Sequence, residues 1–295
     1  MPAPIIVTPA LLLQSEESAW RSPGALALAA TGVAAAAAVA RWRLWRCPKD
    51  ALGGLPRDPA VGALALMVAL VLGSLGAATA AQYGPADAVY ARLLGGVAGN
   101  ILQLLLFAAF AHSALMVAAG KPVPAQRAIS AGLVGAALAI PIVALLAIAV
   151  NALLVALGWP PAPEAAHETL RILVERRDPL LTALTLAHVA ILVPAAEEAM
   201  WRGILQPSMR RAGLGGLASA AATSLLFAAV HWSVIPPEGR PARLAMLVAL
   251  SMALGILRER TGSLLAPIAL HAAFNALNVA VALASAPANP VSSAP

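Results

Sequence analysis

Long apolar stretches alternate with short polar connections along this chain of 295 residues. A membrane-spanning helix needs about 20 apolar residues. The pattern predicts eight such helices, at residues 23–41, 60–81, 93–119, 128–158, 180–211, 214–235, 242–258 and 263–285. The predicted fold class is therefore all-α, a polytopic transmembrane bundle of about eight spanning helices.

Composition supports a protein that lives in a lipid bilayer. Hydrophobic residues make up 61% of the chain and charged residues 11%, and the mean hydropathy is +0.84. Such a chain cannot cover itself with a polar exterior, so an integral membrane protein is predicted. The net charge of +6 comes from Lys and Arg near helix ends, which is typical of membrane proteins and argues against nucleic-acid binding. The abundance of Ala, Gly and Pro and the scarcity of Lys indicate a bacterial cytoplasmic membrane protein.

The apolar pattern divides the chain into five parts. They are an N-terminal segment (1–22), four transmembrane helices (23–158), a loop with a helix on the membrane surface (159–179), a second helical core (180–285) and a disordered tail (286–295). Lys and Arg number twelve on the side of the first connection and seven on the other. The excess predicts that the first connection is cytoplasmic and that both termini lie outside.

Two adjacent carboxylates, Glu197 and Glu198, interrupt the helix predicted at 180–211. A charge at the centre of a spanning helix costs about 2.5 to 3.5 kcal/mol, so the pair is a candidate functional site. Residues four apart share a helix face, which predicts that Glu198 pairs with Arg202 while Glu197 points elsewhere. Glu197 in an apolar site would suit a general base.

Two more polar pieces follow on later helices. Phe227 precedes His231 by four residues, and His271 precedes Asn275 by the same interval. Helix geometry places Glu197 and His231 about 25 Å from the turn between their helices, and His271 at about 20 Å, so the three are expected at a similar depth. The other buried-type polar residues are interpreted as contacts between helices; these are His112, His188, Asn100, Asn151 and Asn278.

The order of these motifs, Glu-Glu-x-x-x-Arg, Phe-x-x-x-His and His-x-x-x-Asn, resembles the CAAX-protease and bacteriocin-processing (CPBP, or Abi) family of intramembrane proteases. The motif residues are Glu197, Glu198, Arg202, Phe227, His231, His271 and Asn275. The resemblance covers the core at 180–285 and implies an endopeptidase that cleaves a membrane-associated protein or peptide. It implies that Glu197 and His231 activate water, that His271 and Asn275 stabilise the oxyanion, and that Glu198 with Arg202 supports them.

The residues leave alternatives open. If the enzyme depends on a metal, Glu197, His231 and His271 would form a zinc site with an open position, although no His-Glu-x-x-His motif is present. The metal-free mechanism is favoured because Asn275 beside His271 suits an oxyanion clamp. The alternative functions are a proton-coupled transporter and a non-catalytic membrane scaffold or immunity protein. The sequence identifies neither the substrate nor the side that the site faces.

Overall fold

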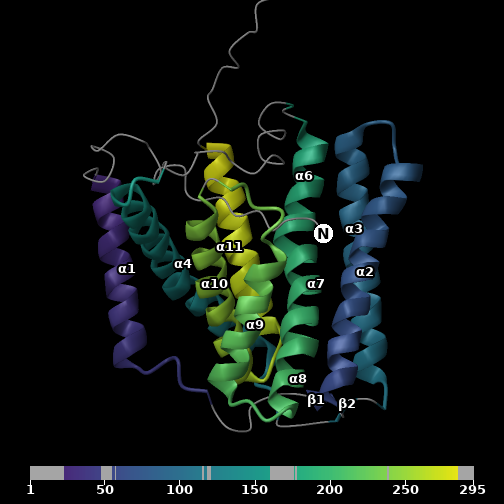
Figure 1. Cartoon of the computed structure of the whole chain (residues 1–295), viewed down its shortest axis with the longest axis horizontal. Coiled ribbons are helices and arrows are strands. Elements are labelled where there is room, and N and C mark those ends of the chain that lie inside the picture. Colours follow the sequence, from purple (N-terminus) through teal and green to yellow (C-terminus); the bar gives the residue numbers. More distant parts are fainter. Residues whose placement is uncertain are drawn as a thin grey trace, which may run out of the picture.

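The computed structural model describes residues 23–47, 55–56, 58–114, 116–117, 121–159, 176, 178–237 and 239–284. Helices running side by side make up this part of the chain (Figure 1). They are α1 (Pro23–Arg41), α2 (Pro59–Tyr83), α3 (Ala88–His112), α4 (Ala125–Ala156), α6 (Pro179–Ala187), α7 (Val193–Met200), α8 (Gln206–Arg211), α9 (Gly216–Val230), α10 (Arg240–Thr261) and α11 (Leu265–Ala284). Two antiparallel strands, β1 (Leu55–Pro56) and β2 (Met116–Val117), pair at one end.

The all-α class predicted from the apolar pattern is confirmed, and each predicted span coincides with a helix. Within the described ranges, five helical stretches are long and apolar enough to cross a membrane: α2, α3, α4, the rod from Pro179 to Arg211, and α10. The apolar parts of α1, α9 and α11 are shorter. The third helix ends at His112 rather than near residue 119, because the chain turns at Ser113 into β2.

The helices α6, α7 and α8 form one rod, which is the predicted span at 180–211. Two π-helical turns, His188–Leu192 and Trp201–Leu205, connect its three parts. The rod runs through the bundle between α2 and α3 on one side and α9, α10 and α11 on the other (Figure 1). On the far side, α4 packs against α10 and α11, and α1 packs against α4. Of the first-half helices, α2 and α3 thus contact the rod directly, and α4 contacts α10 and α11 on the other side of the rod.

Polarity is inverted relative to a water-soluble protein. Large apolar side chains such as Leu64, Met67 and Val71 are exposed on the outside, whereas Glu198 and Arg202 are fully buried inside. An apolar exterior suits lipid, and ionised groups avoid lipid by facing the bundle interior. The described helices therefore form an integral membrane protein, as the composition predicts.

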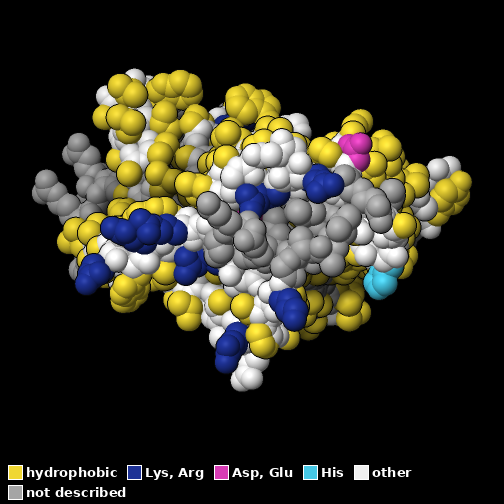
Figure 2. Space-filling model, turned by 90° about the horizontal axis from the view of Figure 1, so that it is seen from below, with side chains coloured by type: hydrophobic (Ala, Val, Ile, Leu, Met, Phe, Trp, Pro, Cys, Tyr) yellow, Lys and Arg dark blue, Asp and Glu magenta, His cyan; other side chains and the backbone are white. Residues whose placement is uncertain are grey.

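Basic side chains gather at the end of the bundle that carries β1, β2 and α8. Viewed from this end, Lys and Arg side chains are prominent and acidic ones scarce (Figure 2). They belong to the last turns of α1, α8 and α10 and the start of α4; among them are Arg41, Arg210, Arg211, Arg260 and Arg127. The positive-inside rule assigns this end to the cytoplasm, which stays a prediction.

At the opposite end, two aspartates cap neighbouring helices. Asp87 accepts hydrogen bonds from the first turn of α3, and Asp178 does the same for α6. The two caps are cross-linked, because Arg176 donates to Asp87 and the Tyr90 hydroxyl donates to Asp178 Oδ2 at 2.8 Å. These donors hold the pKa of each carboxyl below its usual range. The predicted surface helix at 159–179 otherwise lies outside the described residues, as do 1–22 and 286–295.

Candidate functional site

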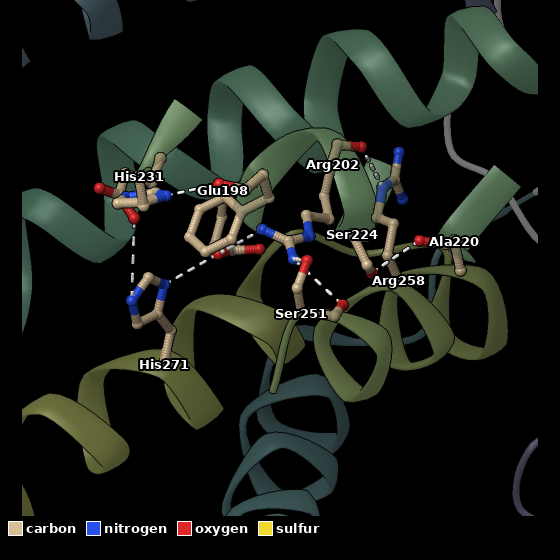
Figure 3. A network of polar contacts seen from close by, with 10 residues as sticks. Glu198, Arg202, Ala220, Ser224, His231, Ser251, Arg258 and His271 are labelled. Carbon is tan, nitrogen blue, oxygen red and sulfur yellow. Dashed lines mark hydrogen bonds and ion pairs between the residues drawn. The ribbon is translucent and has the colours of Figure 1, made fainter. Parts of the chain in front are cut away.

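The adjacent glutamates on α7 have separate surroundings. Glu198 is fully buried, and its Oε1 accepts hydrogen bonds from Arg202 Nη1 at 3.0 Å and from His271 Nδ1 at 2.9 Å (Figure 3). Glu197 is 14% exposed and lines a cavity instead. The division follows from helix geometry, because successive residues point about 100° apart. The predicted pairing of Glu198 with Arg202 is therefore present.

Arg202 fastens α7 to its neighbours. Its Nη2 donates to the Ser251 hydroxyl at 2.6 Å and to the Ser251 carbonyl at 3.1 Å, which ties the rod to α10 (Figure 3). The guanidinium also lies over the ring of Phe227, 5.2 Å from its centroid. Phe227 in turn contacts the rings of Trp201 and His231. Phe227 thus packs between the buried ion pair and the second predicted site residue.

His231 follows the last residue of α9 and is buried. Its Nδ1 is hydrogen-bonded to the Phe227 carbonyl oxygen. Because a carbonyl can only accept, Nδ1 carries a proton, and a neutral ring in this tautomer has its lone pair on Nε2. The helix has 15 residues and rises only about 22 Å, less than the roughly 30 Å of a bilayer core. His231 consequently lies within the bundle rather than at its surface.

A cavity of about 20 Å³ brings Glu197 and His231 together. This space is large enough for a single water molecule. Polar groups reach it from three helices, and apolar side chains complete its wall. The lining residues are Leu70, Asn100, Gln103, Glu197, Met200, Trp201, Val230 and His231.

The third motif lies behind this cavity. His271 on α11 donates through Nδ1 to Glu198, and its Nε2 is 3.9 Å from Glu197 Oε2. Asn275, one turn further on, donates from Nδ2 to the carbonyl oxygen of Val189 at 2.9 Å. Neither side chain is among those that line the cavity. His271 and Asn275 thus contact the rod outside the cavity, close to Glu197.

The contact with Val189 has a cause in the backbone. In the first π-helical turn the N–H of Val193 bonds to the carbonyl of His188, five residues back. The next residue, Pro194, has no N–H, so the carbonyl of Val189 loses its partner within the helix. Asn275 supplies the missing donor. Its position four residues after His271 thus serves the backbone of the rod in this structure.

The second π-helical turn repeats this arrangement. The N–H of Gln206 bonds to the carbonyl of Trp201, and Pro207 follows without a donor. The carbonyl of Arg202 is therefore left unpaired within the helix, and Arg258 Nε of α10 donates to it at 3.1 Å. Two π-helical turns bracket α7, and side chains from α11 and α10 stabilise them. Such turns are frequent at functional sites.

A chain of amides forms the opposite wall of the cavity. Asn100 and Gln103 of α3 line it, and Asn100 Oδ1 is 2.9 Å from His188 Nε2. The predicted role of His188 and Asn100 as a contact between helices agrees with this hydrogen bond. The sequence interpretation missed Gln103 altogether and missed that Asn100 faces the candidate site. The available signal was the pair of amides three residues apart on an apolar helix.

The zinc alternative requires Glu197, His231 and His271 to converge on one point. Within the described ranges, no group of three His, Cys, Asp or Glu side chains is placed to hold a metal ion. Glu197 and His231 line the cavity, whereas His271 lies outside it. The residues present do not fit a three-ligand zinc site.

Comparison with known families supports the class suggested by the three motifs. Residues 179–277, about a third of the chain, match the family described as Type II CAAX prenyl endopeptidase Rce1-like. The matched segment runs from α6 into α11 and contains all seven motif residues. The predicted resemblance to CAAX-type intramembrane proteases is confirmed over this segment. Comparisons with curated proteins and with solved structures found no match.

Proposed function

We propose that this chain is an intramembrane endopeptidase that hydrolyses a peptide bond of a membrane-associated protein or peptide. The observation that carries the proposal is the cavity shared by Glu197 of α7 and His231 at the end of α9. A carboxylate and a ring nitrogen with a lone pair meet there in a space of water size. The family match of the same segment supports a CAAX-type protease.

In the proposed reaction, a water molecule in the cavity donates its two hydrogens to Glu197 and to His231 Nε2. Its oxygen attacks the carbonyl carbon of the substrate, the new C–O bond forms, and one proton passes to Glu197. The tetrahedral intermediate then collapses, the C–N bond breaks, and Glu197 returns the proton to the leaving nitrogen. General base and acid catalysis of this kind contributes about 10² to 10⁴-fold.

We assign Glu198, Arg202 and His271 a positioning role. Their hydrogen bonds fix α7 against α10 and α11. Because Glu198 satisfies both Arg202 and His271, the neighbouring Glu197 is left as the carboxylate available to water. The resemblance itself implies that His271 and Asn275 stabilise the oxyanion. We place the protein in a bacterial cytoplasmic membrane.

Comparative peptidomics tests the proposal without knowledge of the substrate. Membranes of cells that express wild type, Glu197→Gln or Glu259→Gln are compared at equal expression. Glu259 is a buried carboxylate on α10 that does not line the cavity, so it is the matched control. Fragments present in wild type and in Glu259→Gln and absent in Glu197→Gln are expected.

The alternative functions give different results in the same strains. Fragments that persist in Glu197→Gln would contradict the peptidase and favour a non-catalytic scaffold. Proton flux in proteoliposomes that depends on Glu197, without any Glu197-dependent fragment, would favour a proton-coupled transporter.

A further inference from the structure

The N-terminal half of the chain contributes polar groups to the candidate site. Asn100 and Gln103 of α3 are buried and line the same cavity as Glu197 and His231. Both precede the segment that matches the protease family, which begins at residue 179. The rod and α9 therefore provide one wall of the site with Glu197 and His231, and α3 provides another wall that carries two amides.

The hydrogen bonds of these amides leave donors free. Asn100 Nδ2 donates to Gln103 Oε1 at 3.0 Å, and Gln103 Nε2 donates to the Ala69 carbonyl at 3.1 Å. Asn100 Oδ1 lies 2.9 Å from His188 Nε2. An amide nitrogen carries two hydrogens. Each of the two nitrogens thus uses one N–H within this network and retains a second.

Glycines make room for the network at both ends. A Cβ on Gly73 of α2 would lie 2.7 Å from Gln103 Nε2, and a Cβ on Gly96 would lie 2.8 Å from His188 Cε1. Contacts this short do not occur without displacement of the side chain. Hydrogen bonds hold the two amides in place, as donors to a developing charge must be, and the two glycines leave space for the Gln103 and His188 side chains.

We propose that the free N–H groups of Asn100 and Gln103 donate to the carbonyl oxygen of the bound peptide and to the oxyanion that forms on it. The inference rests on the proposed peptidase function. When the water oxygen bonds to the carbonyl carbon, the π electrons of the C=O bond move onto the oxygen, which needs donors in a dry site. Asn275 donates one N–H to Val189 and by the same count keeps a second, but its side chain does not line the cavity. Asn100 and Gln103 are the amides that do.

Two variants remove these donors with little change in shape. Gln103→Met keeps the length of the side chain, and Asn100→Asp keeps the oxygen that faces His188. Each is expected to lower the rate of formation of the Glu197-dependent fragments by about 10²-fold. Asn278→Leu, which removes a buried amide of α11 outside the cavity, is the matched control and should leave that rate unchanged.

A binding measurement separates this role from a purely structural one. A phosphinic peptide with the sequence of an identified fragment junction mimics the tetrahedral intermediate. Its affinity should fall about 10²-fold in Gln103→Met. The affinity of the uncleaved peptide, measured in a Glu197→Gln background, should be the same with and without Gln103→Met. Equal losses for both ligands, or a loss that follows the unfolding temperature, would assign the amides to folding and overturn the proposal.

The two levels of the hypothesis fail in different ways. If fragments depend on Glu197 but form at the wild-type rate in both Gln103→Met and Asn100→Asp, the amide proposal is wrong and the peptidase stands. If no fragment depends on Glu197, the proposed function is wrong and the amide proposal is wrong with it.

Discussion

The carboxamide of Asn275 on α11 donates a hydrogen bond to the carbonyl oxygen of Val189, 2.9 Å away on the rod. That carbonyl has no partner within its own helix, because Pro194 stands where the donor of the π-helical turn would be. An amide in a motif associated with catalysis therefore completes the backbone of the helix that carries Glu197. The relationship makes a prediction about stability as well as activity.

Asn275→Leu should reduce the free energy of unfolding by about 1 to 3 kcal/mol, since it leaves a buried carbonyl without a donor. Pro194→Ala restores an N–H next to that carbonyl, so it should recover part of the loss when combined with Asn275→Leu. Unfolding of the purified protein in detergent, followed by circular dichroism for the four members of the cycle, measures the coupling. Purely additive effects would show that the two residues do not share the carbonyl.

Substitutions of the two adjacent glutamates should affect different properties, cleavage in one case and stability in the other. Glu197→Gln is expected to abolish cleavage and to leave the unfolding temperature unchanged, because Glu197 has no hydrogen-bond partner at its buried Oε2. Glu198→Gln is expected to lower the unfolding temperature, because it weakens the hydrogen bonds with Arg202 and His271. The measurement is the fragment assay together with thermal unfolding. Identical behaviour of the two variants would contradict the division of roles.

Removal of Arg202 should be among the most destabilising single changes in the described core. Arg202→Leu leaves the carboxylate of Glu198 buried beside His271 alone, and breaking one partner of a buried pair costs about 3 to 5 kcal/mol. The double variant Glu198→Leu with Arg202→Leu should recover much of this loss, since no unpaired charge remains. Chemical denaturation in detergent micelles measures the difference. A double variant less stable than Arg202→Leu would refute this account.

Close packing of α2 against α3 supports the part of the cavity wall that Asn100 and Gln103 form. A Cβ on Gly99 would lie 2.7 Å from the carbonyl oxygen of Gly73, and backbone cannot move aside cheaply. Gly99→Ala is therefore expected to cost about 1 to 3 kcal/mol, as overpacking usually does. Gly24→Ala on α1, where no atom lies within 4 Å of the new Cβ, serves as the control and should be near neutral. Equal unfolding temperatures for both variants would mean that α2 and α3 do not pack this closely.

Metal removal should leave cleavage intact. The expectation follows from the positions of Glu197, His231 and His271, which do not converge as a three-ligand set. Protein stripped with chelator is assayed on a peptide that spans an identified fragment junction, with metal content measured on the same sample. Loss of cleavage on chelation and recovery with zinc would instead assign a metal-dependent mechanism to these residues.

Much of the architecture could be predicted because lipid imposes a simple rule on sequence. Backbone groups in a bilayer must be satisfied within the segment, so each long apolar stretch becomes a helix. The predicted span at 180–211 thus coincides with the rod from Pro179 to Arg211. Its two π-helical turns were not predicted. Pro194 and Pro207 mark them, but how the chain accommodates a proline depends on donors from other helices, here Asn275 and Arg258.

The pairing of Glu198 with Arg202 was predictable because it depends only on the four-residue repeat of a helix. His271 as a second partner of Glu198, and the cavity common to Glu197 and His231, depend on how separate helices pack. Gln103 carried too little signal, because even a pair of amides three residues apart on an apolar helix usually forms a contact between helices. Its position on the cavity wall follows from the close approach of α2 and α3.

The sequence by itself determined the helices, their apolar exterior and the small set of polar residues that lipid would exclude, because these depend on composition and on periodicity along one segment. Only the tertiary structure decided which of those residues meet. It placed Glu197 and His231 on one cavity and brought Asn100 and Gln103 of the first half to the wall of the same cavity. It also placed Asn275 outside this cavity, in contact with the backbone of the rod. The physical reason is that contacts between helices depend on packing distances and on unpaired backbone groups, which the order of residues along the chain does not express.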